Sequence, residues 1–157
     1  MSFTVTLSSS EMSMCNILGN MRHMVNRAGK TVDRQKGNQS ALDIDMDGVI
    51  AEYAFCRHWN IFFDLSSQAR SGSYDCLLNN KRIDIKSTRY ATGRLIKTLK
   101  PNPDIDIYVL AIIDGNTVSF PGWVSSENFI QEQNILNLSN KGDCYAMTQD
   151  QLTSWSK

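Results

Sequence analysis

Apolar positions recur with helical spacing in the first part of the chain. Ser8 and Glu11 form the S-x-x-E pattern of a capping box, which marks the start of a helix. Apolar residues then follow at intervals of three and four before Gly29: Met14, Ile17, Leu18, Met21, Met24, Val25 and Ala28. The pattern predicts an N-terminal helix over about 9–28.

A second helix is predicted from about Asp47 to Trp59. The polar residues from Lys30 to Ser40 indicate a surface loop before it. Apolar residues leave this second helix almost no polar face, which predicts that it is buried: Val49, Ile50, Tyr53, Ala54, Phe55 and Trp59. Glu52 is the exception within it.

The pattern changes to short β-like runs after Ser71. Tyr74–Leu78 and Arg82–Thr88 flank Asn79-Asn80, which is a two-residue hairpin signal. A third run, Ile105–Ile113, is followed by a turn at Asp114-Gly115-Asn116 and a second hairpin strand, Thr117–Phe120, which we expect Pro121-Gly122-Trp123 to end. The chain then predicts a short helix over Glu127–Leu136, a strand around Tyr145 and a terminal helix containing Leu152 and Trp155.

These elements predict an α/β fold, with a central mixed β-sheet flanked by helices. The 157 residues fit a single domain, large enough to bury a core without staples. Within it we expect the N-terminal helix at about 9–28, a core at about 47–123 and a C-terminal segment at 124–157.

Composition indicates the location of the protein and the state of its cysteines. No apolar run reaches the ~18 residues of a membrane span, and the N-terminus lacks a signal-peptide pattern, so we expect no membrane and a cytoplasmic location. The cysteines are too far apart in the sequence for a C-x-x-C site, which indicates reduced, buried residues: Cys15, Cys56, Cys76 and Cys144.

Charge is distributed unevenly, although the formal net charge is zero. The C-terminal third is acidic. The stretch from Lys81 to Lys100 contains a single acidic residue, Asp84, among seven basic ones: Lys81, Arg82, Lys86, Arg89, Arg94, Lys97 and Lys100. A basic stretch of this kind indicates contact with nucleic acid or a solvated basic face.

Candidate chemistry gathers on the first predicted hairpin. Residues two apart in a strand share a face, so Asp84 and Lys86 point one way and Ile83 and Ile85 the other. A two-residue turn at 79–80 would place Asp75 opposite Asp84, with the two carboxylates about 5 Å apart. Such a pair is destabilising unless a cation lies between its members, and oxygen ligands suit magnesium or manganese. A D-x-K tripeptide alone, however, is common in surface ion pairs.

The chain from Gly48 to about Trp123 resembles the PD-(D/E)XK nuclease superfamily, in particular small members of the bacteriophage type. In that restriction-endonuclease-like core a helix precedes a β-hairpin that carries the motif. Tyr74 stands where the family pattern has proline. The resembling segments are 48–55, 73–75, 82–89, 108–110 and 122–123, which read GVIAEYAF, SYD, RIDIKSTR, YVL and GW.

The resemblance implies a metal-dependent nuclease that hydrolyses DNA. Asp75, Asp84 and the backbone carbonyl of Ile85 would bind Mg²⁺ or Mn²⁺, Glu52 would reach the metal directly or through water, and Lys86 would be the catalytic lysine. Four basic residues beyond the motif are candidate phosphate contacts: Arg89, Arg94, Lys97 and Lys100. RNA remains a possible substrate, and a homodimer would allow cleavage of both strands.

The segment from Asp43 to Ile50 supports competing interpretations. It begins like an EF-hand loop, but the twelfth position, which should be glutamate, is Ala54. D-x-D-G-V-I also resembles the first motif of haloacid-dehalogenase-like phosphatases, in which Asp45 would be the nucleophile and Asp47 the acid/base. A module that binds nucleic acid without cleaving it is the non-enzymatic alternative.

Overall fold

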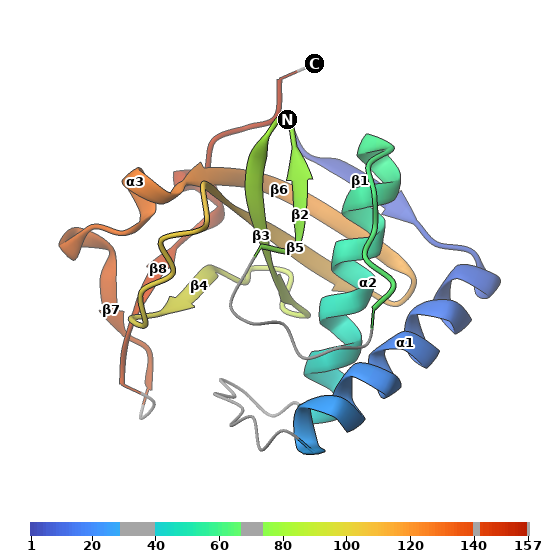
Figure 1. The fold of residues 1–157 in the computed structure, drawn as a ribbon. Helices are drawn as coiled ribbons and strands as arrows, with labels where there is room; N and C mark the ends of the chain where they lie inside the picture. The colour runs from blue at the N-terminus through green and yellow to red at the C-terminus, as the bar shows by residue number, and fades with distance from the viewer. Residues whose placement is uncertain (29–39, 67–73, 140–141, 157) are drawn as a thin grey trace.

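The computed structural model describes residues 1–28, 40–66, 74–139 and 142–156. The predicted loop over 30–40 therefore lies outside the described residues, except for Ser40. A five-stranded sheet has helices on one side and a smaller, three-stranded sheet on the other (Figure 1). The central mixed sheet flanked by helices, predicted from the sequence, is confirmed.

Helix α1 spans Ser9–Ala28, as the periodicity predicts. The capping box is formed: the Ser8 N–H donates to Glu11 Oε2 at 2.7 Å, and the Glu11 N–H donates to Ser8 Oγ at 3.2 Å. These two bonds satisfy N–H groups that the first turn of a helix leaves without partners.

Helix α2 spans Ala41–Trp59 and so begins six residues before the predicted start. Ser40 caps it, because the Ser40 side chain accepts a hydrogen bond from the Asp43 N–H, and Asn60 ends it in a left-handed conformation. The apolar pattern missed the first turns because residues 41–46 read ALDIDM, in which apolar residues alternate with Asp43 and Asp45 and show no helical period. The aspartates of these turns and of the next one pair with other parts of the fold. His23 contacts Asp45, and Arg89 binds Asp47.

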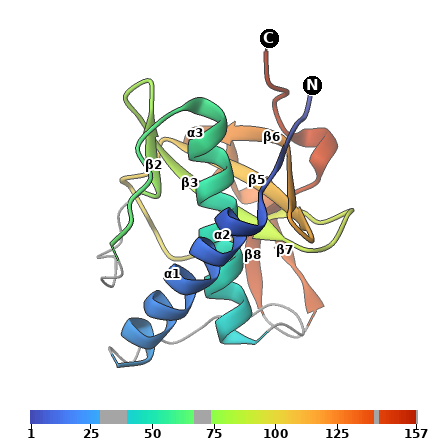
Figure 2. The ribbon, with the colours of Figure 1, turned by 90° about the vertical axis from the view of Figure 1, so that its right-hand side faces the viewer.

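The two helices pack closely where α1 carries Gly19. A Cβ atom at that position would lie 2.8 Å from Met46 Cγ and 2.9 Å from Met46 Cα. The missing side chain lets α1 approach α2, and both helices cover the same side of the large sheet (Figure 2).

The large sheet has the strand order β1-β6-β5-β3-β2. Only β3 and β5 are parallel; the other neighbours are antiparallel. The strands are β1 (Phe3–Thr6), β2 (Cys76–Leu78), β3 (Lys81–Thr88), β5 (Ile107–Asp114) and β6 (Thr117–Ser125).

The first hairpin has the predicted turn and register. Asn79 and Asn80 have positive φ values of 50° and 61°, which a two-residue turn of type I′ requires. Cys76 pairs with Ile83, as expected for a turn at 79–80. The sequence therefore predicted the alignment of this hairpin correctly.

The smaller sheet has the order β4-β8-β7 and is antiparallel. It is formed by β4 (Leu95–Thr98), β7 (Ile135–Asn137) and β8 (Asp143–Met147), with the short helix α3 (Ser126–Phe129) and 3-10 turns at Glu132–Asn134 and Gln149–Gln151 nearby. The predicted strand around Tyr145 is confirmed as β8.

Two apolar cores lie on the two faces of the large sheet. Ile83, Ile85 and Val109 pack with α2 in the larger core. Tyr108 and Leu110, which alternate with Val109, belong to the second core with residues of the smaller sheet and α3. Strand β5 therefore presents alternate residues to different layers of the molecule.

Three predictions for the second half of the chain are wrong. Strand β6 continues through Pro121-Gly122-Trp123, because the register shifts between Leu110 and Ile112 and Pro121 falls within that irregularity. The expected helix over Glu127–Leu136 is broken into α3, a 3-10 turn and β7.

The expected terminal helix is replaced by a 3-10 turn and an extended segment. Thr153 pairs with Trp123 through two backbone hydrogen bonds, and the indole N–H of Trp155 donates to the Phe120 carbonyl at 3.0 Å. These contacts with β6 satisfy the terminal backbone and side chain without a helix.

Candidate active site

Strand β2 is shorter than its neighbour β3 and pairs with only the first part of it. Strand β2 pairs with Lys81 to Ile83, whereas β5 pairs with β3 from Ile83 to Thr88 on the other side. In the described ranges, no strand pairs with β3 beyond Ile83 on the β2 side. The predicted site residues gather at this edge.

Asp75 ends the pairing between β2 and β3. The expectation that it stands opposite Asp84 in the ladder is wrong, since the ladder begins at Cys76. The Asp75 N–H donates to the Ile83 carbonyl at 2.8 Å, and Asp75 Oδ2 accepts the Ile85 N–H at 2.7 Å. The carboxylate thereby takes the place of a strand partner at the edge.

Asp84 and Lys86 lie on the face of β3 opposite the buried Ile83 and Ile85, as predicted. Lys86 Nζ is 2.7 Å from Asp84 Oδ1. The Asp84 side chain is 12% exposed and the Lys86 side chain 38%. Lys86 is therefore the member of the pair that a ligand can reach.

Glu52 comes to the same region from α2 and is 8% exposed. Its Oε2 is 3.0 Å from Nη1 of Arg22 in α1. Arg22 also donates to the carbonyls of Asp64 at 2.7 Å and Ser66 at 3.2 Å. The Arg22 guanidinium thus connects α1 to Glu52 in α2 and to the segment that follows α2.

Arg22 was not among the candidates taken from the sequence. Its signal is its position: it follows the buried Cys15 and Leu18 by seven and four residues, on the face of α1 that packs against α2. A charged residue at a buried position of a helical pattern requires a partner.

The four predicted side chains influence one another electrostatically. Burial, followed by the charges of Glu52 and Asp84, raises the pKa of Asp75 well above its ordinary value. Burial disfavours the charged form of Lys86, but the charges of Asp84, Asp75 and Glu52 outweigh it and raise the Lys86 pKa. Both shifts share one cause, the closeness of the acidic groups to one another and to Lys86.

The donor types at this edge fit a hard divalent cation. Carboxylate and carbonyl oxygens are the ligands of Mg²⁺ and Mn²⁺, and a cation would relieve the repulsion that Asp75 experiences. The Ile85 carbonyl faces the same edge as the Ile85 N–H, because both groups of a strand residue point to one side.

The donors are not gathered into a ready cage. Among the described residues, no three His, Cys, Asp or Glu side chains are grouped closely enough to hold a metal ion. Arg22 holds Glu52 and Lys86 holds Asp84, so protein cations already bind two of the three carboxylates.

The predicted phosphate contacts occupy different environments. Arg94 and Lys100 are exposed at either end of β4. Arg89 binds Asp47 through two bonds of 2.9 and 2.6 Å, and its side chain remains 48% exposed. Lys97 is only 7% exposed, and its ammonium donates to the carbonyls of Thr98 and Lys100.

The residues of the phosphatase alternative lie inside α2. Asp45 Oδ2 is 2.8 Å from His23 Nδ1, and Asp45 Oδ1 accepts a bond from Asn26 at 3.3 Å. Asp47 is buried and ion-paired with Arg89. Both aspartates therefore have partners that connect α2 to neighbouring elements.

A family model matches the chain over residues 2–156, nearly its whole length. The chain belongs to DUF5843. This family is described as one of unknown function, so membership assigns no activity. Neither a curated protein nor a solved structure matches the chain.

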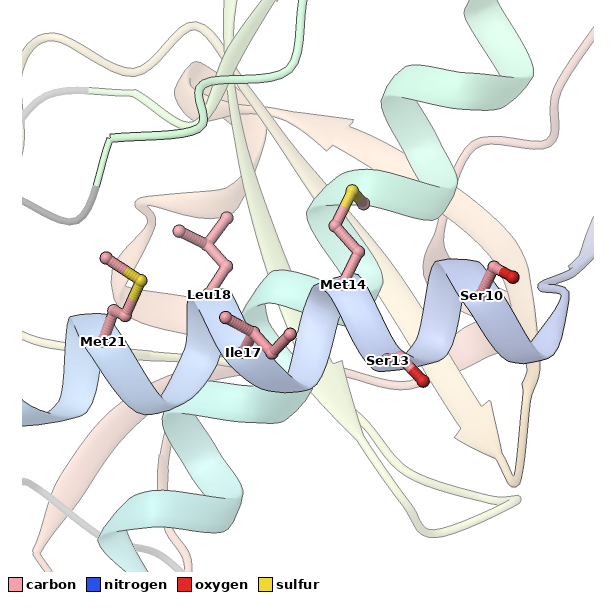
Figure 3. A pocket seen from close by; sticks show the side chains of 6 residues that line it. All are labelled: Ser10, Ser13, Met14, Ile17, Leu18 and Met21. Carbon is pink, nitrogen blue, oxygen red and sulfur yellow. The ribbon is translucent and has the colours of Figure 1, made fainter.

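Two hollows in this DUF5843 member differ in their chemistry. A cleft of about 290 Å³ adjoins the candidate site, between α1 and α2; it is lined by Arg22, Asn26, Ile44, Asp45, Gly48, Glu52 and Asp75. A hollow of about 530 Å³ lies along α1 alone and contains no charged side chain; Figure 3 shows its lining residues, Ser10, Ser13, Met14, Ile17, Leu18 and Met21. The cleft, which contains Glu52 and Asp75, is continuous with the candidate site.

Proposed function

We propose that this protein is a metal-dependent nuclease that hydrolyses phosphodiester bonds in DNA. The observation that carries the proposal is the convergence of Glu52 from α2, Asp75 from the end of β2, and Asp84 and Lys86 from β3 at one sheet edge. The resemblance to PD-(D/E)XK nucleases, with their restriction-endonuclease-like core, supports it through the same residues.

Lys86 serves this reaction as a cation. Its raised pKa keeps the ammonium protonated around neutral pH, so it donates a proton in a hydrogen bond and does not act as a base. Its position beside Asp84 and its exposure allow it to bind a phosphate oxygen, where negative charge develops during hydrolysis.

Asp75, Asp84, Glu52 and the Ile85 carbonyl would hold the Mg²⁺ or Mn²⁺ ion. When bound, such an ion supplies an activated water and neutralises charge on the phosphate. The Ile85 N–H donates to one oxygen of Asp75 and so positions this carboxylate beside the Ile85 carbonyl at the sheet edge.

The exposed Arg94 and Lys100, with the half-exposed Arg89, are the proposed contacts for the DNA backbone. A homodimer for cleavage of both strands remains a prediction, and so does the cytoplasmic location. Within the described residues, no helix is both long and apolar enough to cross a membrane. All four cysteines are free and buried, in agreement with the sequence prediction.

The test is incubation of plasmid and single-stranded DNA with Mg²⁺, Mn²⁺ or EDTA. Wild type should cleave with either metal and not with EDTA, and Lys86→Ala should lower kcat by about a hundredfold or more. Asp45→Asn serves as the comparison, because Asp45 belongs to the phosphatase alternative.

The other outcomes identify the alternatives. Hydrolysis of p-nitrophenyl phosphate that is lost only in Asp45→Asn would favour a phosphatase. DNA binding without cleavage in any metal would favour the non-cleaving module. Either result would overturn the nuclease proposal.

A further inference from the structure

The interiors of α1 and α2 each contain one glycine, but only one of them has a packing reason. Glycine is, apart from proline, the residue least favourable to a helix interior. At Gly19, a Cβ atom would collide with Met46. At Gly48, a Cβ atom would meet no described atom within 4 Å other than those of the adjoining α2 backbone and chain neighbours.

The open space at Gly48 belongs to the cleft beside the candidate site. Ile44, Gly48 and Glu52 are spaced by four residues, so they form one stripe along α2 that faces the cleft. Glu52 marks the end of the stripe at the site, and Ile44 lies two turns away. A side chain at Gly48 would stand between them.

The charges that line the cleft indicate which part of a nucleic acid can enter it. The cleft is lined by three carboxylates, those of Asp45, Glu52 and Asp75, and by one guanidinium, that of Arg22. The single guanidinium is already bound to Glu52 and so attracts phosphate little, whereas the carboxyl groups can accept hydrogen bonds from a neutral group. A nucleobase is neutral, whereas the phosphates are better placed near Lys86 and the basic residues beyond it.

Size and chemistry agree with a single base. The volume of about 290 Å³ lies just below the ~300–1,000 Å³ of small-ligand pockets. Ile44 supplies an apolar wall, and Asp45, held by His23 and Asn26, supplies an acceptor with a fixed orientation.

We propose that the cleft receives one unpaired nucleobase next to the bond that is cut, and that Gly48 keeps it open. The inference rests on the proposed nuclease function and names its substrate class: single strands, flaps, or duplexes from which one base is extruded. It also assigns a positioning role to Asp45 and Asn26 at the far part of the cleft.

The test compares wild type with Gly48→Leu, which fills the cleft, and Gly48→Ala, which fills it less. Ser13→Leu is the matched control, because it adds the same side chain to an exposed position of α1. Melting temperatures identify folded variants. Both Gly48 variants should melt above wild type, because each replaces an unfavourable helix residue.

The substrates are a labelled single-stranded oligonucleotide and a series with an abasic site at each successive position. Fluorescence anisotropy in EDTA measures binding, and cleavage in Mg²⁺ measures kcat/KM. For wild type, one abasic position next to the cleaved bond should weaken binding and kcat/KM by about tenfold.

Gly48→Leu should bind the intact strand about tenfold more weakly and lose its sensitivity to that abasic position. Gly48→Ala should show a smaller loss, and Ser13→Leu should behave as wild type. If Gly48→Leu retains wild-type binding and abasic sensitivity, or if no abasic position matters in wild type, the cleft does not hold a base. If wild type cleaves nothing, the nuclease proposal fails, and the anisotropy series alone decides on the cleft.

Discussion

Asp75 has a buried carboxylate whose surroundings favour its neutral form. Burial and the charges of Glu52 and Asp84 raise its pKa. Below the ordinary pKa of aspartate, this group is protonated in both the folded and the unfolded chain, so it does not change the free energy of unfolding. As the pH rises, the unfolded chain ionises first, so the folded state loses stability until its own, raised pKa is passed.

Asp75→Asn should therefore stabilise the protein at neutral pH and abolish cleavage. The amide oxygen can still accept the Ile85 N–H, while the charge is removed. We expect the melting temperature to rise by at least about 2 °C, since 1 kcal/mol corresponds to ~2–4 °C for domains of about this size. The gain should shrink toward zero as the pH approaches 4, which melting curves from pH 3 to 8 would show.

Asp106→Asn provides the control of opposite sign. Hydrogen bonds from Arg82 lower the pKa of Asp106, so its charge stabilises the fold above the ordinary pKa of aspartate. That contribution is lost as the pH falls through the lowered folded-state pKa. Asp106→Asn should lower the melting temperature at neutral pH; equal shifts for both variants would contradict this electrostatic account.

Lys97 and Lys100 differ in burial, although both belong to the basic stretch of the sequence. Lys97 donates to two backbone carbonyls inside the fold, whereas Lys100 is exposed. Lys97→Met should cost about 1–3 kcal/mol of stability, because carbonyls lose their donor. Lys100→Ala should leave stability unchanged and reduce the slope of log affinity for DNA against log salt by about one.

Urea unfolding and DNA titrations at several salt concentrations would measure the two effects. A lower salt slope for Lys97→Met with unchanged stability would show that Lys97 contacts phosphate after all. Sequence alone predicted both lysines as contacts because a run of basic residues does not reveal which of them lie on the inner side of a strand.

At the scale of elements, close packing of α1 on α2 depends on Gly19. Gly19→Ala would place a methyl group against Met46, and overpacking of this kind costs about 1–3 kcal/mol. The better helix propensity of alanine returns up to about 1 kcal/mol, so the net effect should be destabilising. Urea unfolding would show a lower midpoint, whereas the exposed neighbouring substitution Asn20→Ala should not lower it.

Elements with local signals were predictable from the sequence. The capping box and the 3.6-residue period placed α1, and the Asn79-Asn80 turn placed the first hairpin in its correct register. Strands β1 and β4 were missed, because four-residue strands depend on partners distant in sequence, namely β6 and β8. The C-terminal segment was predicted as a helix because its pairing with Trp123 is equally non-local.

In the candidate site, too, the features with local causes were predictable from the sequence and the non-local ones were not. Asp84 and Lys86 share a strand face for a local reason, and the structure brings Asp75 and Glu52 to their edge. The contact of Arg22 with Glu52 depends on how α1 lies across α2, which no short pattern records. The predicted pairing of Asp75 with Asp84 was wrong because the side chain of Asp75, and not the backbone of a paired strand, accepts the hydrogen bond from the Ile85 N–H.

At the scale of the whole molecule, a bound cation should stabilise the fold. The carboxylates repel one another in the folded state and separate on unfolding, so a divalent ion binds the folded chain preferentially. The gain is about 2.7 kcal/mol once the free ion reaches about 100 times its dissociation constant. Wild type should thus melt at a higher temperature as MgCl₂ or MnCl₂ is added, with NaCl of equal ionic strength as the reference.

Two variants separate ion binding from catalysis in the same titration. Asp84→Asn removes a proposed ligand and should abolish the shift caused by the divalent ion. Lys86→Ala removes a positive charge beside the ligands and should retain the shift, or enlarge it, while cleavage is lost. If wild type and Asp84→Asn respond alike, the ion binds elsewhere, and the convergence of acids at this sheet edge has another cause.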